Sequence, residues 1–336
     1  MLSDFDSSGV GVANGNFFSL PFTIDDSKVV LMCVPWDVTV SYGHGTAKAP
    51  AALIEASSQL DLYDSSAPDA WRAGVATLPI DHTIEQLSNA TRPVAKRVIE
   101  HLEAGGDQGD VEELIQQVNG ASRQMNEIVY NTVSRLLDSG KIVGIVGGDH
   151  STPYSLIKAL GERYDNFGIL HIDAHRDLRV AYEGFEYSHA SVMYNVLRDV
   201  ESMSSLVQVG VRDLCDQEQQ LAMDSDRVSS FEDLSLAREQ FEGRSWGDQC
   251  REIVSRLPQH IYVSFDIDGL DISYCPHTGT PVPGGLSYNQ AVYLLEQIVA
   301  SGRVVVGFDV VEVNPSDESV VDLATGARIL YKLCGI

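Results

Sequence analysis

The chain has 336 residues, of which 44% are hydrophobic, which is enough for one large domain or two small ones with a sizeable core. Its 23 basic and 48 acidic residues give a net charge of −25, and a field of that sign repels nucleic acid and anionic membranes. We expect neither a membrane span nor a signal peptide, because no apolar run is long enough and the N-terminus lacks a basic region. The five scattered cysteines form no C-x-x-C pair, which favours reduced thiols and a cytoplasmic location.

The N-terminal part of the chain is predicted to form an irregular arm, one strand and three helices. The arm covers residues 1–28, which are polar and include a Gly/Asn patch, and the apolar run 29–34 predicts a buried strand. Helices are expected over residues 46–58, 84–103 and 111–139. Pro93 is expected to split or kink the second helix, and residues 63–83 are expected to be rich in loops.

From residue 142 onwards, predicted strands and helices alternate. Apolar runs predict strands over residues 142–146, 167–172, 206–211, 261–265 and 304–308. Helices are predicted over residues 153–162, 191–200, 289–300 and 319–334, and an acidic helical region followed by a longer helix is expected before residue 256. Alternating helices and near-continuous apolar strands indicate an α/β fold with a parallel sheet covered on both faces. Residues 29–336 show no clear internal boundary and are expected to form a single domain.

Three short motifs place histidines and carboxylates directly after apolar runs. In D-A-H-R-D (173–177), polar side chains recur every second residue, so they can converge as the segment leaves a strand. Ligands of open α/β sheets bind beyond the carboxyl ends of the strands, where all these candidates lie. The six candidate metal ligands are His150, Asp173, His175, Asp177, Asp266 and Asp268. Two histidines and four carboxylates can hold two divalent cations and leave room for a water.

The same residues must be weighed against plainer interpretations. One D-x-D motif is weak support in a chain this acidic, but a purely structural origin for all three motifs would leave several buried carboxylates unpaired. Asp149 is expected either to orient a histidine or to make a hydrogen bond within its loop. His171 precedes the cluster and is expected to point away from it into the core. His44 and His277 are expected to be solvated loop residues.

Five motifs in combination resemble those of the ureohydrolases, the family that includes arginase, agmatinase and related guanidino-acid hydrolases. They are G-G-D-H-S (147–151), D-A-H-R-D (173–177), S-F-D-I-D-G-L-D (264–271), T-G-T-P-V-P-G-G-L (278–286) and V-E-V-N-P (311–315). They fall in the family's order, and the resemblance covers about residues 29–333. It implies a three-layer fold with a central parallel sheet of about eight strands, two manganese ions per subunit, and a homo-trimer or homo-hexamer. Nickel or cobalt would suit the same ligands to some degree.

The resemblance also implies a role for each motif residue. One metal would be held by His150, Asp173, Asp177 and Asp266, and the other by His175, Asp173, Asp266 and Asp268, so that Asp173 and Asp266 bridge. A guanidinium is a poor electrophile, and two metals can hold hydroxide at neutral pH to attack it. Asp177 would orient that hydroxide, Glu312 would pair with the guanidinium, and His189 would pass a proton to the leaving amine. The products would be urea and an amine.

The loop of residues 178–188 bears on the choice of substrate. It lacks the Asn and Ser/Thr cluster with which arginases recognise an amino acid, which disfavours L-arginine. Glu183, Glu186 and the neighbouring aromatic Tyr182 favour a cationic or apolar tail, so agmatine is the first choice. Arg179 favours a carboxylate instead, as in 4-guanidinobutanoate, 3-guanidinopropanoate or a formimidoylglutamase substrate. Ile272 replaces the family's usual proline, so guanidine or a biguanide stays an alternative, and a non-catalytic subunit of a hetero-oligomer is an alternative of another class.

Overall fold

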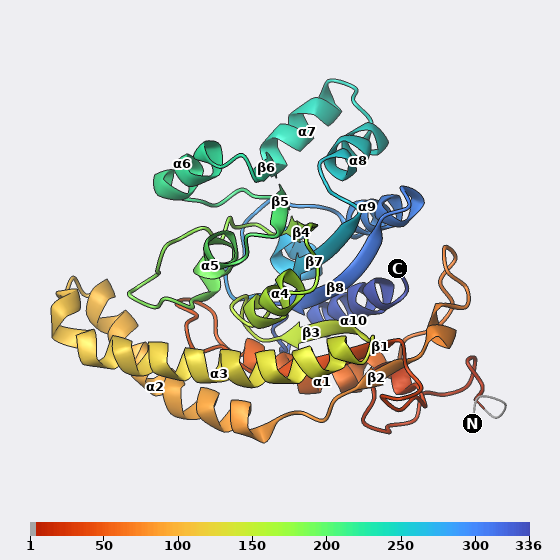
Figure 1. The fold of residues 1–336 in the computed structure, drawn as a ribbon, viewed down its shortest axis with the longest axis horizontal. Helices are drawn as coiled ribbons and strands as arrows, with labels where there is room; N and C mark the ends of the chain where they lie inside the picture. Colours follow the sequence, from red (N-terminus) through yellow and green to blue (C-terminus); the bar gives the residue numbers. More distant parts are fainter. Residues whose placement is uncertain (1–4) are drawn as a thin grey trace.

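The computed structural model describes residues 5–336 and consists of an eight-stranded parallel sheet between two layers of helices (Figure 1). The strands lie in the order β2-β1-β3-β8-β7-β4-β5-β6. Their bounds are β1 (Val29–Val34), β2 (Val75–Thr77), β3 (Ile142–Gly147), β4 (Phe167–Ile172), β5 (Met203–Val209), β6 (Val228–Phe231), β7 (His260–Asp266) and β8 (Val304–Val311). Every neighbouring pair is parallel, which confirms the predicted three-layer α/β fold and the number of strands that the resemblance implied.

Helices pack on both faces of this sheet. Their bounds are α1 (Ala49–Ser57), α2 (His82–Glu103), α3 (Glu112–Asp138), α4 (Tyr154–Gly161), α5 (Val192–Asp199), α6 (Asp216–Asp224), α7 (Asp233–Phe241), α8 (Trp246–Ser255), α9 (Tyr288–Ala300) and α10 (Val321–Cys334). Figure 1 shows α2 and α3 as a long pair that extends past the sheet on the side of the carboxyl ends of the strands. In the described part of the chain, no helix combines the length and the apolar character that crossing a bilayer requires.

Alternate side chains of each strand enter different halves of the core. In β1, Val29, Leu31 and Cys33 belong to the core under α1, α8, α9 and α10, whereas Val30 and Met32 belong to the core under α2, α3, α4 and α5. This is the two-residue period of an extended chain, applied to a strand that is buried on both sides. The continuous apolar runs of the sequence therefore reflect a sheet covered by helices on both faces.

The sequence patterns predicted the six central strands and missed the two edge strands. β2 has three residues and lies inside the stretch that was expected to be loops. β6 has the sequence V-S-S-F and is half-exposed, and it lies inside the stretch that was expected to be helical before residue 256. That stretch in fact contains α6, β6, α7 and α8. Short, partly polar edge strands carry too little apolar pattern to be recognised from the sequence.

Two further expectations about the N-terminal part differ from the structure. Helix α2 continues through the exposed Pro93 and is not split there. The irregular arm contributes to the core, because Phe17, Phe18 and Leu20 are buried against α1 and α10 around a single 3-10 turn. The division into an arm and one domain stays a prediction.

Candidate metal centre

The six predicted metal ligands and Glu312 all lie at the ends of four adjacent strands in the middle of the sheet. In the order β3-β8-β7-β4, these strands end at the D-H motif, at Glu312, at Asp266 and at the D-A-H-R-D motif. Carboxyl ends of neighbouring parallel strands lie at one edge of the sheet, so residues more than one hundred positions apart in sequence are brought together there. The cluster is consequently buried at the centre of that edge.

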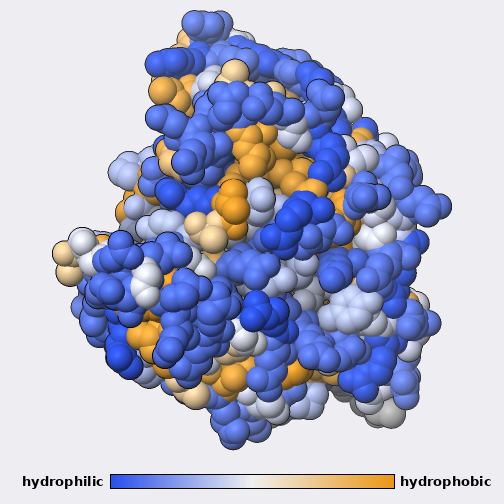
Figure 2. All heavy atoms as spheres, turned by 60° about the vertical axis from the view of Figure 1, so that its left-hand side comes forward, coloured by the Kyte–Doolittle hydropathy of each residue, from blue (hydrophilic) through white to orange (hydrophobic). Residues whose placement is uncertain are grey.

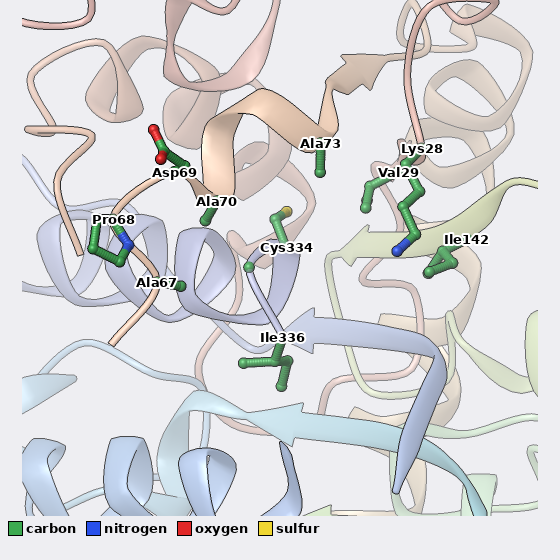
Figure 3. Close-up of a pocket in the computed structure, with 11 residues that line it drawn as sticks. Lys28, Val29, Ala67, Pro68, Asp69, Ala70, Ala73, Ile142, Cys334 and Ile336 are labelled. Atoms are coloured by element: carbon green, nitrogen blue, oxygen red, sulfur yellow. The ribbon is translucent and has the colours of Figure 1, made fainter. Parts of the chain in front are cut away.

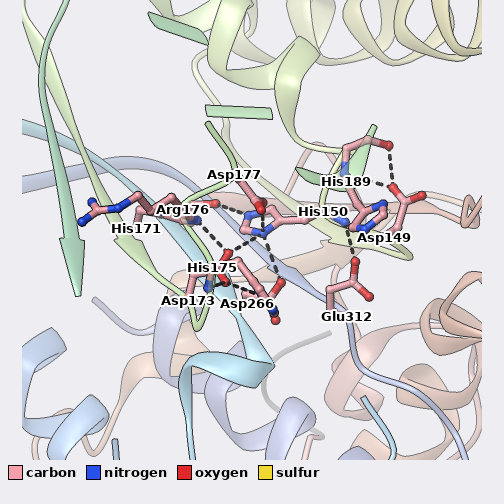
Figure 4. A network of polar contacts seen from close by, with 12 residues as sticks. Asp149, His150, His171, Asp173, His175, Arg176, Asp177, His189, Asp266 and Glu312 are labelled. Carbon is pink, nitrogen blue, oxygen red and sulfur yellow. Dashed lines mark hydrogen bonds and ion pairs between the residues drawn. The ribbon is translucent and has the colours of Figure 1, made fainter. Parts of the chain in front are cut away.

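The first cluster consists of His150, Asp173, Asp177 and Asp266, which converge on one point (Figure 4). His150 Nδ1 lies 2.9 Å from Asp173 Oδ2 and 3.1 Å from both Asp177 Oδ2 and Asp266 Oδ2. All four side chains are almost completely buried. The structure therefore brings together the four residues that were predicted to share one metal.

The second cluster consists of Asp173, His175 and Asp268. His175 Nδ1 lies 3.1 Å from Asp268 Oδ2 and 3.3 Å from Asp173 Oδ1. Asp173 thus directs one carboxylate oxygen to each cluster. Asp266 was also predicted to belong here, but its Oδ1 accepts the backbone N–H of Asp268 at 2.8 Å, and its bridging role stays a prediction.

The charges of these side chains suit a cation at each point. Burial and the charges of Asp268 and Asp173 raise the pKa of Asp266 well above its usual range, and burial and Asp173 raise the pKa of Asp177 to about 6. Burial opposes charge on His150, but its contacts with the three carboxylates raise its pKa. His150 Nδ1 and Asp177 Oδ2 are buried without a hydrogen-bond partner among residues 5–336, although they lie 3.1 Å apart. Nitrogen and oxygen atoms that converge on one point without hydrogen bonds between them have the arrangement expected of ligands around a cation.

His171 does not point into the core, and that expectation was wrong. Its Nε2 lies 2.8 Å from Asp173 Oδ2, and its Nδ1 faces Gln208 Nε2 at 3.0 Å. Because an amide NH₂ can only donate, Nδ1 accepts, and the proton of the neutral ring lies on Nε2, from which it is donated to Asp173. His171 and Asp173 share one face of β4, so the two-residue period that identified the motif also applies to His171. His171 therefore orients a carboxylate that serves both clusters.

A second polar chain orients His150. Its Nε2 lies 2.9 Å from Ser264 Oγ, so that Nδ1 is directed to the cluster. Asp309 is completely buried beside them on β8, opposite Ser264 in the sheet. Burial raises the pKa of Asp309, whereas the charge of His150 and the hydrogen bond that Asp309 Oδ1 accepts from the backbone N–H of Phe265 lower it. A histidine held at its second nitrogen presents the first one in a defined direction, as metal ligands require.

Two of the candidate catalytic residues have strained backbones. Asp177 has a φ of 54° and Glu312 a φ of 59°, in the left-handed region that costs an ordinary residue about 1–2 kcal/mol. The carbonyl of Asp177 accepts hydrogen bonds from the N–H groups of Met193 and Tyr194 at the start of α5, which hold it in place. Such strain persists where the surrounding structure enforces it, and it concentrates at functional positions.

Glu312 lies next to the first cluster but belongs to neither cluster. Its Oε1 accepts the backbone N–H of His150 at 2.9 Å, and its backbone is tied by Thr278 Oγ1 and by Gly148 O. Burial and the charges of Asp149 and Asp268 raise the pKa of Glu312 well above its usual range. A buried carboxylate in a crowded anionic region is stabilised by a cation, and no basic side chain among residues 5–336 forms an ion pair with it.

His189 lies beside Asp149 on the other side of His150 (Figure 4). Burial and the neighbouring histidines His175 and His150 lower the pKa of His189 to about 3. At neutral pH the ring is neutral, so it can accept a proton before it passes one on. Asp149 is fully buried, and its Oδ1 accepts both N–H and Oγ–H of Ser151.

A cavity of about 390 Å³ leads to the clusters. Its lining residues are Ser41, Tyr42, His175, Asp177, Arg179, Tyr182, His189, Ala190, Asp213, Leu214, Glu218, Thr280, Pro281 and Val282. Figure 2 brings this side of the molecule forward and shows a largely hydrophilic surface. The cavity has room for a small molecule beside the clusters.

The acidic residues of the loop 178–188 do not face this cavity, and that expectation was wrong. Glu186 lies 3.4 Å from Arg123 and 3.8 Å from Arg198 on the helices around it. Burial and the charge of Glu103 raise the pKa of Glu183 to about 7, although the positive charge of Arg92 on α2 acts in the opposite direction. Of this loop, Arg179 and Tyr182 line the cavity. A loop has no fixed period, so the sequence did not show which of its side chains turn inward.

A second hollow, of about 410 Å³, lies at the opposite end of the sheet (Figure 3). There Lys28, Val29 and Ile142 at the starts of β1 and β3 face Cys334 and Ile336 near the C-terminus. Its lining contains no histidine and no group of carboxylates. The arrangement that can hold cations is thus confined to the carboxyl end of the sheet in the described part of the chain.

Comparison with known proteins agrees with this geometry. The model of the arginase family matches residues 27–335, which is nearly the whole chain. The chain belongs to the arginase family. It is 31% identical over 315 residues to the N(1)-aminopropylagmatine ureohydrolase of Thermus thermophilus, covering 93% of this chain and 91% of that protein. It is 28% identical over 297 residues to the agmatinase of Bacillus anthracis, covering 87% of this chain and 86% of that protein.

Solved structures share the fold. The agmatine ureohydrolase of Thermoplasma volcanium superimposes with a TM-score of 0.70 at 22% identity, covering 99% of this chain and 95% of that one. The proclavaminate amidino hydrolase of Streptomyces clavuligerus gives 0.71 at 21% identity, with 98% of each chain covered. As an arginase-family ureohydrolase, the chain is a hydrolase that acts on C–N bonds. The resemblance seen in the sequence motifs is confirmed.

Proposed function

We propose that the chain hydrolyses the guanidino group of a small cationic amine, agmatine in the first instance, to urea and the amine, which for agmatine is putrescine. The observation that carries the proposal is the pair of buried clusters beside a cavity of about 390 Å³. The family supports hydrolysis of a C–N bond, and the clusters supply the place for it. The preference for one substrate over another depends on the residues that line the cavity.

The clusters suit two divalent cations, for which we propose manganese, with nickel or cobalt as alternatives. His150, Asp173, Asp177 and Asp266 would hold one, and His175, Asp173, Asp266 and Asp268 the other. Bound there, two such cations would lower the pKa of a water enough to make a nucleophile at neutral pH. The support from this chain is the convergence of buried ligand atoms, of which His150 Nδ1 and Asp177 Oδ2 have no hydrogen-bond partner among residues 5–336.

The other steps fall to side chains of this chain. Glu312 would pair with the guanidinium and place its carbon beside the clusters, because it is a buried carboxylate without a cationic partner among residues 5–336. Asp177 would accept a hydrogen bond from the attacking water and orient it. His189 is neutral at neutral pH, so its ring nitrogen can take a proton from that water and deliver it to the leaving amine.

The cavity wall favours a positively charged tail. Asp213 lines the cavity as an exposed carboxylate and has no hydrogen-bond or ion-pair partner for its side chain among residues 5–336. Arg179, which suggested an acidic substrate, lies over the ring of Tyr182 at 4.8 Å, and its Nε is 3.7 Å from Glu218 Oε2. Its charge is therefore partly offset within the wall. The names of the two curated relatives also refer to guanidino amines, agmatine and its aminopropyl derivative.

Other guanidino compounds remain as alternatives to be tested. An acidic substrate such as 4-guanidinobutanoate would need Arg179 to leave Glu218, and L-arginine would need contacts for an amino acid group. Guanidine itself would leave most of the cavity unfilled. We also propose a homo-oligomer in the cytoplasm, which size measurement and fractionation would test. A non-catalytic subunit would bind metal without turnover.

The deciding experiment is a urea-release assay on the purified protein. It compares agmatine, aminopropylagmatine, L-arginine, 4-guanidinobutanoate, 3-guanidinopropanoate and guanidine, each with Mn²⁺, Ni²⁺ or Co²⁺. Formimidoylglutamate is tested with the same metals by its release of glutamate, because its hydrolysis gives formamide instead of urea. We expect the guanidino amines to give the highest kcat/KM. Preference for a guanidino acid would indicate that Arg179 binds a carboxylate tail, instead of Asp213 binding a cationic one. Absence of turnover with every compound and metal would refute the proposal and favour a non-catalytic subunit.

A further inference from the structure

Thr39 links the buried Asp149 and the half-buried His189, which are both far from it in the sequence. It follows β1, is completely buried, and is distant in sequence from the residues of both clusters. Its Oγ1 accepts the backbone N–H of His189 at 3.1 Å, lies 3.4 Å from His189 Nδ1, and lies 3.3 Å from Asp149 Oδ2. No sequence motif contains Thr39, and its plain interpretation is a hydroxyl that satisfies one backbone N–H.

We propose that Thr39 is a positioning residue that holds the neutral ring of His189 in the tautomer protonated on Nδ1, with Nε2 left free to accept a proton in the cavity. The inference rests on the proposed function for its catalytic meaning, because it assigns the nitrogen through which His189 would work. The tautomer itself follows from contacts of Thr39, Asp149 and His189 alone.

The assignment follows from counting protons on the Thr39 hydroxyl. A hydroxyl has one proton to donate and two lone pairs with which to accept. The backbone N–H of His189 occupies one lone pair. The carboxylate of Asp149 can only accept, so the hydroxyl proton is directed to its Oδ2. What remains toward His189 Nδ1 is a lone pair, and Nδ1 must therefore donate.

The opposite orientation would leave a buried carboxylate oxygen without a donor. Asp149 is completely buried, and Ser151 donates both its N–H and its hydroxyl to Oδ1 rather than Oδ2. If Thr39 donated to His189 Nδ1 instead, Oδ2 would lose its side-chain donor among residues 5–336. An unsatisfied buried oxygen is costly, and a charged one more so.

The segment around Thr39 is held rigidly, and so is the other side of the ring. Arg92 on α2 donates through one nitrogen to the carbonyl of Val38 at 2.8 Å and to that of Val40 at 2.6 Å, on both sides of Thr39. Tyr182 lies edge-on to the ring of His189, with ring centroids 5.9 Å apart. The imidazole is thus confined between a fixed hydroxyl and an aromatic ring, and it lines the cavity.

The test removes or keeps the hydroxyl at one position. Thr39→Val deletes it with little change of shape, Thr39→Ser keeps it, and Thr46→Val is the matched control. Thr46 is also completely buried, but its hydroxyl has no hydrogen-bond partner among residues 5–336. Each protein is labelled with ¹⁵N-histidine and loaded with Zn²⁺, a diamagnetic cation, and the signals of His189 are assigned by their absence in His189→Asn. Kinetics are measured in parallel with Mn²⁺ and the best substrate of the panel.

We expect a pyrrole-like ¹⁵N shift for Nδ1 and a pyridine-like shift for Nε2 in the unmodified protein, in Thr39→Ser and in Thr46→Val. In Thr39→Val the two nitrogens should shift toward the opposite tautomer, and kcat should fall about 10–100-fold with KM nearly unchanged. Thr39→Ser should recover most of that kcat.

Two results would overturn the inference. One is an Nε2-protonated ring in the unmodified protein, which is decisive even if Thr39→Val fails to fold. The other is a Thr39→Val protein with unchanged tautomer and unchanged kcat, which would reduce Thr39 to a backbone contact. If no guanidino compound is turned over, the proposed function fails, but the NMR measurement still decides the tautomer because it needs no turnover.

Discussion

Replacing Asp266 by asparagine should have opposite effects on stability with and without metal. Asp266 Oδ2 faces His150 Nδ1 at 3.1 Å, while Oδ1 accepts the N–H of Asp268, which an asparagine oxygen can still do. Without metal, Asp266→Asn removes a carboxylate whose pKa is raised by burial and by Asp268 and Asp173, so it should stabilise the fold. With metal, it replaces an anionic ligand by an NH₂ donor that points at the cation.

The size of the second effect follows from binding linkage. Loss of one anionic ligand should weaken metal binding about 100-fold or more, since even residues that only orient a ligand are worth about 10–100-fold. At a metal concentration of about 100 times the dissociation constant of the unmodified protein, metal stabilises that protein by about 2.7 kcal/mol and the variant by only about 0.4 kcal/mol, so the substitution removes about 2.3 kcal/mol of stabilisation. For a chain of this size, the midpoint of thermal unfolding should fall by roughly 5 °C.

The assay is thermal unfolding of the protein with EDTA and with saturating Mn²⁺, together with urea release. Asp271→Asn is a matched control, because Asp271 lies nearby but accepts only from Ser273. The control should lower the midpoint equally in both conditions. Should Asp266→Asn lower it equally in both conditions as well, Asp266 would be structural and the proposed metal centre would lose its shared ligand.

Three further predictions address the tail, the surface and the clusters. Asp213→Asn should raise KM for agmatine about three- to fivefold with kcat nearly unchanged. Asp216→Asn, outside the cavity lining, is the control and should leave KM unchanged. An unchanged KM for Asp213→Asn as well would refute recognition of the substrate tail by Asp213. Burial opposes ionisation of Asp64, but hydrogen bonds from Lys332 and Ser66 lower its pKa to about 2. That lies below the unfolded value of about 3.9, so Asp64 contributes about 1 kcal/mol above pH ~4 that is lost as the pH falls toward ~2. Denaturant unfolding of the metal-free protein and Asp64→Asn should show a difference that shrinks over this range, and a constant difference would contradict the argument. His171→Phe should weaken metal binding about 10–100-fold in chelator competition, whereas unchanged affinity would mean that the ring only fills space.

The fold was predictable where the chain is buried on two sides. The central strands are continuous apolar runs because helices cover both faces of the sheet. In β1, for example, alternate side chains enter the two different halves of the core. β2 and β6 escaped recognition because an edge strand is short, and because β6 has two serines on a half-exposed surface. Their pairing with β1 and β5 depends on contacts across the fold, which local pattern does not contain.

The candidate cluster was predictable for a related reason. A strand end gives its side chains defined directions, so Asp173, His175 and Asp177 could be assigned to one edge of the sheet before their distances were known. The structure divides them, with Asp177 in the first cluster, His175 in the second and Asp173 in both. The same rule, extended by two residues, would have included His171. In contrast, Glu183 lies in a loop, where backbone direction changes at every residue and no period applies, and its φ of 54° is itself irregular.

Charge balance connects the clusters to the choice of substrate. The first and second clusters contain four carboxylates, Asp173, Asp177, Asp266 and Asp268, and two divalent cations would balance these four charges. Of the other buried carboxylates at this edge of the sheet, Asp149 interacts with the charge of Arg92, whereas the charge of Glu312 would be left uncompensated by the two cations. A guanidinium beside Glu312 would complete the balance in a region where an unpaired buried charge is costly. A neutral amide or ester would not, so the arrangement of these carboxylates favours a cationic reacting group before any contact with the substrate tail is considered.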